Sequence, residues 1–115
     1  MDTRAVMDHQ YKAFAAGDPD EVAKDFAEDA VLIRVDAVFE GRAAIRGAYA
    51  EMFTSRFKPG AYDITVDAER LHGDIAYIAW RASNATENVV LGTDTFVIRN
   101  GKIVAQTYTA KVEPK

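Results

Sequence analysis

Apolar and polar residues alternate with a period of two in the second half of the chain. The clearest case begins at residue 62, where one side of the alternation consists of Tyr62, Ile64, Val66 and Ala68. This period is that of a β-strand with one buried face. Similar runs follow at residues 75–82, 89–99 and 102–112. Because Asn100-Gly101 is typical of a type I′ hairpin, this half predicts a four-stranded antiparallel meander.

The first half of the chain shows helical spacing instead. Residues 4–16 place side chains on one face at intervals of three and four, namely Val6, Met7, Gln10, Tyr11 and Phe14. Gly17 follows at the position where a helix commonly ends. Asp18-Pro19-Asp20-Glu21 then supplies an N-cap, a first-turn proline and an acidic residue, which predicts a short second helix through Val22 and Phe26.

A short strand and a third helix are predicted between these two patterns. Residues 30–35 form an apolar, β-branched run, and residues 38–41 a second short extended segment. Over residues 42–56 one helical face carries Ile45, Tyr49, Met52 and Phe53, and Pro59-Gly60 ends the pattern. The expected architecture is therefore α+β, with the helices packed on one face of a bent sheet.

Composition and charge restrict the classes of function. With 115 residues, 49% of them apolar, the chain is expected to form one domain over residues 1–115. A net charge of −4 with scattered basic residues argues against nucleic acid as a partner. No signal-like or membrane-spanning apolar run is evident and there is no cysteine, so we expect a cytoplasmic protein with no membrane partner.

Three segments resemble a known superfamily. They are residues 11–31, beginning YKAFAAGDPDEVAKDF, residues 41–46 (GRAAIR) and residues 92–103 (GTDTFVIRNGKI). Over essentially the whole chain, the sequence resembles the SnoaL-like and ketosteroid-isomerase-like members of the nuclear transport factor two-like superfamily. The resemblance implies a cone-shaped, curved, mostly antiparallel sheet with three helices enclosing a pocket, and a homodimer formed through the sheet. Functions in this superfamily range from isomerases, cyclases and epoxide hydrolases to non-catalytic binding domains.

Asp94 is the predicted catalytic residue. It lies in an apolar strand, where burial would raise its pKa and keep it protonated as a hydrogen-bond donor to an oxyanion. In the steroid isomerases, an acid two residues before a strand phenylalanine has this role, and Asp94 and Phe96 match that place. In the alternative interpretation, Asp94 pairs with Arg34 or caps a neighbouring backbone group.

Further residues are expected to bind the substrate. The resemblance puts Gln10, with Tyr11 beside it, at the place of an oxyanion tyrosine, and Arg34 at the place of a basic aspartate. Arg34 would either anchor an anionic ligand, with Asp36 as a displaced general base, or form an ion pair with Asp36 or Asp94 at the cavity mouth. The predicted substrate-binding residues are Gln10, Tyr11, Phe14, Arg34, Trp80, Phe96, Gln106 and Tyr108.

The single tryptophan has two possible roles, and neither histidine is assigned one. Trp80 is either a wall of the pocket or part of a dimer contact on the outer sheet face. His9 and His72 are expected to be solvated, and the carboxylates show no metal-ligand spacing. Since the chain also lacks a phosphate loop, a nucleophile elbow and a dinucleotide motif, we expect neither a metal nor an organic cofactor.

The sequence therefore predicts a protein that holds a small apolar or weakly polar organic molecule in a pocket. One hypothesis is a cofactor-independent isomerase, cyclase or hydratase that acts on this molecule through Asp94, with Tyr11, Gln106 and Tyr108 orienting it. The alternative is a non-catalytic ligand-binding or homodimeric interaction domain of the same fold.

Overall fold

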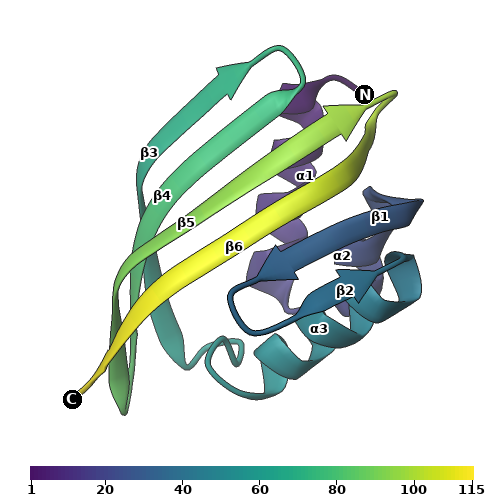
Figure 1. Ribbon diagram of the computed structural model, residues 1–115. Helices are drawn as coiled ribbons and strands as arrows, with labels where there is room; N and C mark the ends of the chain where they lie inside the picture. Colours follow the sequence, from purple (N-terminus) through teal and green to yellow (C-terminus); the bar gives the residue numbers. More distant parts are fainter.

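Three helices lie along one face of a curved six-stranded sheet (Figure 1). The computed structural model describes all residues from Met1 to Lys115. The helices are α1 (Thr3–Ala16), α2 (Pro19–Lys24) and α3 (Arg42–Thr54). The strands are β1 (Phe26–Arg34), β2 (Val38–Glu40), β3 (Tyr62–His72), β4 (Ile75–Asn84), β5 (Glu87–Arg99) and β6 (Lys102–Pro114). The α+β prediction is thus confirmed.

The strands follow the order β2-β1-β6-β5-β4-β3, and only the pairing of β1 with β6 is parallel. The predicted meander is present as β3 to β6. Its last hairpin has the expected turn, since Asn100 and Gly101 have φ angles of 52° and 74°. The parallel pairing brings β1, from the first half of the chain, beside the last strand, so both halves contribute to one inner sheet face.

Local capping chemistry sets the corner between α1 and α2. Gly17 ends α1 with a φ of 63°, in the left-handed region. The Asp18 carboxylate then accepts hydrogen bonds from the backbone N–H groups of Asp20 and Glu21, as an N-cap does.

The prediction that the second helix reaches Phe26 was wrong. Helix α2 ends at Lys24, and Phe26 begins β1, four residues before the predicted strand start at Ala30. The reason is tertiary, because Phe26 pairs with Ile103 of β6 and the Ile103 N–H donates to the Asp25 carbonyl at 2.7 Å. Long-range pairing outweighs the local helical pattern here.

The predicted alternation along β3 was also wrong beyond Val66. A bulge interrupts its pairing with β4 between Val66 and Ala68, so Ala68 does not share the face of Tyr62 and Val66. Glu69 instead lies opposite Ile78, whose side chain is buried in the core. The bulge thereby turns a carboxylate toward α1.

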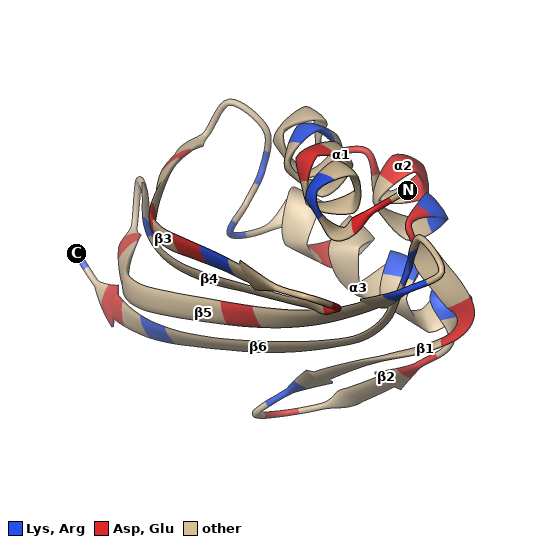
Figure 2. Cartoon of the chain, turned by 90° about the horizontal axis from the view of Figure 1, so that it is seen from above, with Lys and Arg blue, Asp and Glu red and all other residues tan.

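The helices cover only the inner face of the sheet, as the view from above shows (Figure 2). The core between these layers includes Val6 and Met7 of α1, Ile45 of α3, Phe26 and Ile103, all fully buried. None of the three helices has the length and apolar character needed to cross a lipid bilayer.

Candidate functional site

An apolar cavity of about 240 Å³ lies between the helices and the inner faces of β3 to β6. We call it the inner cavity. Fourteen of its 17 lining residues are hydrophobic, and the three that are not are Gln10, Asp94 and Gln106. This composition suits a small, mainly apolar molecule that meets a few polar groups.

Asp94 is the most buried charged group of this cavity. It is 6% exposed, and both of its carboxylate oxygens accept hydrogen bonds. Trp80 Nε1 donates to Oδ1 at 2.8 Å, and Gln106 Nε2 donates to Oδ2 at 2.7 Å. Neither Arg34 nor a backbone N–H binds it, so the alternative interpretation as an ion pair or backbone cap was wrong.

Burial raises the pKa of Asp94 to about 6, although the hydrogen bonds from Trp80 and Gln106 act in the opposite direction. A carboxyl group with this pKa is roughly 90% ionised at pH 7. Both neighbours present N–H donors to it, which is the arrangement that a carboxylate requires. Asp94 is therefore a carboxylate at neutral pH and becomes half-protonated at about pH 6.

A helix residue completes the network. The Tyr49 hydroxyl of α3 donates to Gln106 Oε1 at 2.7 Å, which orients the amide so that its Nε2 faces Asp94. Sequence reasoning assigned Tyr49 to the core, and its ring is indeed buried. A tyrosine on a buried helix face needs a partner for its hydroxyl, and this was the signal that could have identified it.

Trp80 lies on the inner face, so it is a wall of the cavity and not part of an outer contact. Its pairing partner on β5 is Gly92, and a Cβ at Gly92 would lie 2.2 Å from the indole ring. The missing side chain thus makes room for Trp80, which also stacks on Tyr108 with ring centroids 6.0 Å apart.

Tyr108 lies directly opposite Asp94 in the register of β5 and β6. Burial and the negative charge of Asp94 raise its pKa, so the phenol stays protonated at neutral pH and can donate a hydrogen bond. A proton acceptor and a hydrogen-bond donor are therefore neighbours on one wall of the cavity.

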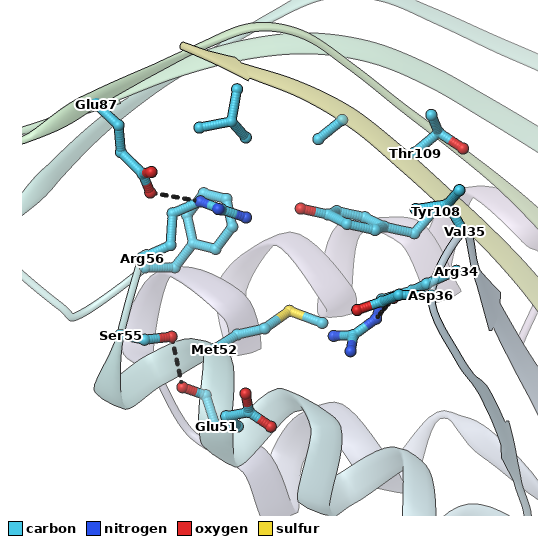
Figure 3. Close-up of a pocket in the computed structure, with 13 residues that line it drawn as sticks. Arg34, Val35, Asp36, Glu51, Met52, Ser55, Arg56, Glu87, Tyr108 and Thr109 are labelled. Carbon is cyan, nitrogen blue, oxygen red and sulfur yellow. Dashed lines mark hydrogen bonds and ion pairs between the residues drawn. The ribbon is translucent and has the colours of Figure 1, made fainter. Parts of the chain in front are cut away.

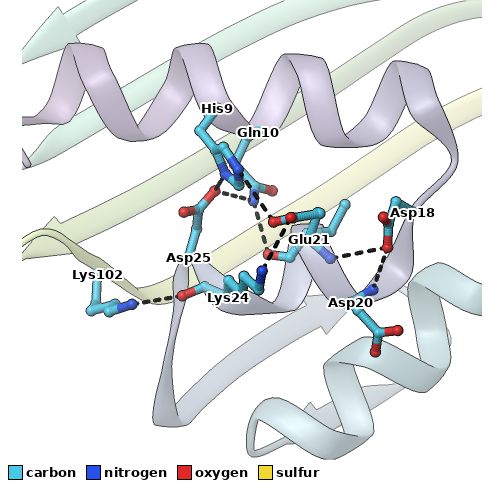
Figure 4. Close-up of polar contacts among 9 residues, drawn as sticks. His9, Gln10, Asp18, Asp20, Glu21, Lys24, Asp25 and Lys102 are labelled. Carbon is cyan, nitrogen blue, oxygen red and sulfur yellow. Dashed lines mark hydrogen bonds and ion pairs between the residues drawn. The ribbon is translucent and has the colours of Figure 1, made fainter.

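The polar groups of Gln10 and Tyr11 are engaged elsewhere. Gln10 Nε2 donates to the Val22 carbonyl at 2.9 Å and to Asp25 Oδ2 at 2.8 Å (Figure 4). The Tyr11 hydroxyl donates to Glu69, which also pairs with Arg4. Both residues line the inner cavity, as do the predicted Phe14 and Phe96, but the amide and hydroxyl are already bound.

The prediction that His9 is solvated holds only in part, since its side chain is 37% exposed but also contacts a buried acid. His9 Nδ1 lies 2.5 Å from Asp25 Oδ2, and Asp25 is only 4% exposed (Figure 4). Sequence reasoning missed Asp25, since it stands between a helix and a strand whose boundary was misplaced. His72 is exposed, as expected.

Arg34 is the one predicted binding residue that does not line the inner cavity. Its Nε donates to Asp36 Oδ1 at 3.1 Å, and its guanidinium lies 4.8 Å from the centre of the Phe39 ring. The predicted ion pair with Asp36 is therefore present. Arg34 belongs to a second cavity, which Tyr108 also lines.

The fold is that of the cone-shaped α+β proteins of the nuclear transport factor two-like type. The sequence pattern of the SnoaL-like domain matches residues 7–106, so the chain belongs to the SnoaL-like domain family. A search of curated protein sequences finds no match.

Solved structures share the fold at low sequence identity. A Kribbella flavida protein provisionally named a ketosteroid isomerase is 20% identical, with a TM-score of 0.77 over 95% of this chain and 77% of that one. A Sinorhizobium meliloti protein provisionally named a polyketide cyclase is 22% identical, with a TM-score of 0.76 over 90% of this chain and 93% of that one. A de novo designed protein with a curved β-sheet reaches 0.78 at 16% identity, over 94% of this chain and 84% of the design. Since a design matches equally well, this similarity identifies the fold and not an activity.

Proposed function

We propose that this protein binds a small apolar carbonyl compound in the inner cavity and catalyses a proton transfer on it, as a cofactor-independent isomerase or cyclase does. The observation that carries the proposal is Asp94, a buried carboxylate with a pKa raised to about 6 in an otherwise apolar cavity. A base is most effective when its pKa lies near the working pH, and this value approaches neutrality. The family and its isomerase- and cyclase-named neighbours support the same class.

In this mechanism Asp94 acts as a base instead of the donor that its sequence context suggests. One carboxylate oxygen takes a proton from the carbon next to the carbonyl, and the electron pair of that C–H bond moves into an enolate. The Tyr108 hydroxyl donates a hydrogen bond to the enolate oxygen. Asp94 then returns the proton to a different carbon, which gives the isomer. In a cyclase, the enolate carbon instead attacks a second carbonyl carbon of the same molecule, the π bond of that carbonyl breaks, and the resulting alkoxide takes the proton from Asp94 as the ring closes.

Exchange of carbon-bound protons with D₂O tests this step without knowledge of the product. Proton NMR would follow a panel of small cyclic and β,γ-unsaturated ketones with the wild-type protein. Asp94→Asn should lower the exchange rate at least about 100-fold. Asp63→Asn, the same change at an exposed position on β3, is the matched control and should have no effect. Equal rates in the wild type and Asp94→Asn would refute the proposal.

Non-catalytic binding is the second candidate function. It is favoured by the engagement of Gln10 Nε2 with Asp25 and of the Tyr11 hydroxyl with Glu69, because neither of these donors on the α1 side of the cavity is then free for a substrate. Recovery of a bound compound, chemically unchanged after long incubation with the protein, would support this function over proton transfer.

We also propose that two copies pair through the outer sheet face. In the register of the sheet, one uncharged row crosses five strands and consists of Val38, Ile33, Thr107, Thr95 and Tyr77. Three of these are exposed apolar side chains, at 59% for Val38, 44% for Ile33 and 38% for Tyr77. No helix covers this face (Figure 2). Uncharged apolar surface of this kind is typical of interaction sites.

A further inference from the structure

A second cavity, of about 430 Å³, is also lined by Tyr108 but not by Asp94 (Figure 3). We call it the outer cavity. It is formed by the turn after β1, the end of α3 with the residues that follow it, and the adjoining ends of β5 and β6. Met52, Phe57 and Tyr108 line both cavities. The inner and outer cavities therefore adjoin each other at these three residues.

The outer cavity differs from the inner one in charge, because two arginines, Arg34 and Arg56, and three acidic residues, Asp36, Glu51 and Glu87, line it. Arg34 donates through Nε to Asp36 at 3.1 Å, and Arg56 donates through Nε to Glu87 at 2.6 Å. In Figure 3 both guanidinium groups extend into the space between α3 and β6, on either side of the Tyr108 hydroxyl. Since Nε makes the hydrogen bond to Asp36, the terminal nitrogens of Arg34 remain as donors for a ligand, whereas Arg56 also interacts with the Tyr108 hydroxyl.

The two side chains of the Arg34–Asp36 ion pair differ in their exposure to solvent. The Arg34 side chain is 18% exposed, whereas that of Asp36 is 68% exposed. A carboxylate in solvent stabilises its partner only weakly, so Asp36 does little to neutralise the inward-facing guanidinium. A planar guanidinium with a free edge binds a carboxylate through two parallel hydrogen bonds, and an entering anion can use that edge without displacing Asp36.

We propose that the inner and outer cavities are two subsites of one cleft, and that its ligand is an amphipathic carboxylate. The apolar body would occupy the inner cavity beside Trp80, and the carboxylate would bind Arg34, with Arg56 as a second cation. This inference rests on the proposed use of the inner cavity as the binding site and adds the substrate class. Tyr108 lies at the junction, where a carbonyl between the two ends of such a ligand would meet its hydroxyl and Asp94.

Three probes that share one apolar body test the charge preference, namely 4-phenylbutyrate, its methyl ester and 4-phenylbutylamine. Calorimetry gives the dissociation constants, and the fluorescence of Trp80, the only tryptophan, reports occupancy of the inner cavity. The carboxylate should bind at least about tenfold more tightly than the ester, and the amine most weakly, because hydrogen bonds to charged groups are the stronger ones. The carboxylate and the ester should both change the Trp80 emission.

Variants then show which residue causes the preference for 4-phenylbutyrate over its methyl ester. Arg34→Gln should remove the tenfold advantage of 4-phenylbutyrate and leave the affinity of the methyl ester unchanged, which also shows that the protein is folded. Arg46→Gln, an exposed arginine of α3 that pairs with Asp20, is the matched control and should keep the preference. Asp94→Asn should keep it as well, so that loss of catalysis and loss of anion recognition are distinguishable.

Three results would overturn the inference. Equal affinity for the acid and the ester would exclude recognition of the carboxylate, and tightest binding of the amine would reverse its sign. Binding of 4-phenylbutyrate that depends on Arg34 but leaves Trp80 emission unchanged would place the molecule in the outer cavity alone and refute the single cleft.

Discussion

The charge state of Asp94 depends on a balance between burial and two hydrogen bonds. Burial disfavours the ion and raises the pKa, while the donors on Trp80 and Gln106 stabilise the ion and lower it, with a result of about 6. Gln106 in turn is held by Tyr49. Three uncharged side chains therefore tune one acid, and changes in any of them should be visible in its titration.

Replacement of Gln106 by leucine should raise the pKa of Asp94 above about 6, by roughly one unit, since one donor to the carboxylate is lost. Carbon-detected NMR would measure this titration, with the signal assigned through Asp94→Asn. Tyr49→Phe removes a hydrogen bond from the network but no donor from Asp94 itself, so it should produce a smaller shift. A wild-type pKa near 3.9, the ordinary value for aspartate, would show that Asp94 is solvated and would contradict this account.

The same raised pKa links stability to pH. Because the folded-state pKa of about 6 exceeds the unfolded value, the folded protein binds the Asp94 proton more tightly, and this stabilisation is lost as pH rises from about 4 to about 6. Relative to Asp94→Asn, the wild-type free energy of unfolding should therefore fall by about 2 kcal/mol between pH 4 and pH 7. Urea denaturation across this range measures the difference, and parallel curves for the two proteins would show that Asp94 has no raised pKa.

At this scale the sequence predicted Asp94 in the cavity, together with five of the fourteen hydrophobic residues that line it, namely Tyr11, Phe14, Trp80, Phe96 and Tyr108. It could not identify the partners of the polar groups. Tyr49 meets Gln106 from a helix 57 positions away in the sequence, and Tyr11 meets Glu69 from 58 positions away. Contacts of this kind depend on register and helix placement, which no local pattern determines.

Between neighbouring strands, the pairing of Trp80 with Gly92 controls the shape of the cavity wall. The indole lies over the glycine and is thereby placed to donate to Asp94 and to stack on Tyr108. A side chain at Gly92 would occupy the space that the indole now fills. One position on β5 thus supports the orientation of three groups in the site.

Gly92→Ala should destabilise the fold by about 1 to 3 kcal/mol, because the added methyl group overlaps the Trp80 ring in a packed core. The displaced indole should also lose its hydrogen bond to Asp94, with a change in Trp80 emission. Gly47→Ala is the control, since Gly47 lies within α3 with open space around it, and it should stabilise the helix by about 0.5 to 1 kcal/mol. Equal, small effects at the two positions would show that Gly92 is not needed for close packing.

The succession of helices and strands was largely predictable from periodicity and turn chemistry, as the hairpin at Asn100-Gly101 illustrates. Two features were not. The bulge at Val66 and Ala68 inserts one residue without a turn signal, and the strand start at Phe26 depends on pairing with Ile103. Both features matter for the site, because the bulge delivers Glu69 to Tyr11 and the early strand start leaves Asp25 facing Gln10.

In the whole molecule, the two faces of the sheet differ, because only the inner face is covered by helices. The inner face carries the cavities, and Asp94 and Tyr108 alternate there with Thr95 and Thr107 on the outer face. A second uncharged row lies two residues along each strand from the row of Ile33 and Thr107. It crosses four strands and consists of Ile75, Val97, Ala105 and Val31. The sequence alone indicated pairing only through a family resemblance, since the register that aligns these rows comes from the fold.

A lysine in the middle of the outer face should prevent pairing of two copies. Thr107→Lys places a charge at the centre of the uncharged row, where burial against a second copy would leave it unpaired and costly. Light scattering coupled to gel filtration should give twice the chain mass of 12.7 kDa for the wild type and the single mass for this variant. Thr65→Lys adds the same charge on the exposed edge strand β3, outside the uncharged rows, and should remain a dimer. A monomeric wild type, or a Thr107→Lys variant that still pairs, would exclude this face as the interface and leave its exposed Ile33, Val38 and Tyr77 side chains without a partner of the same chain.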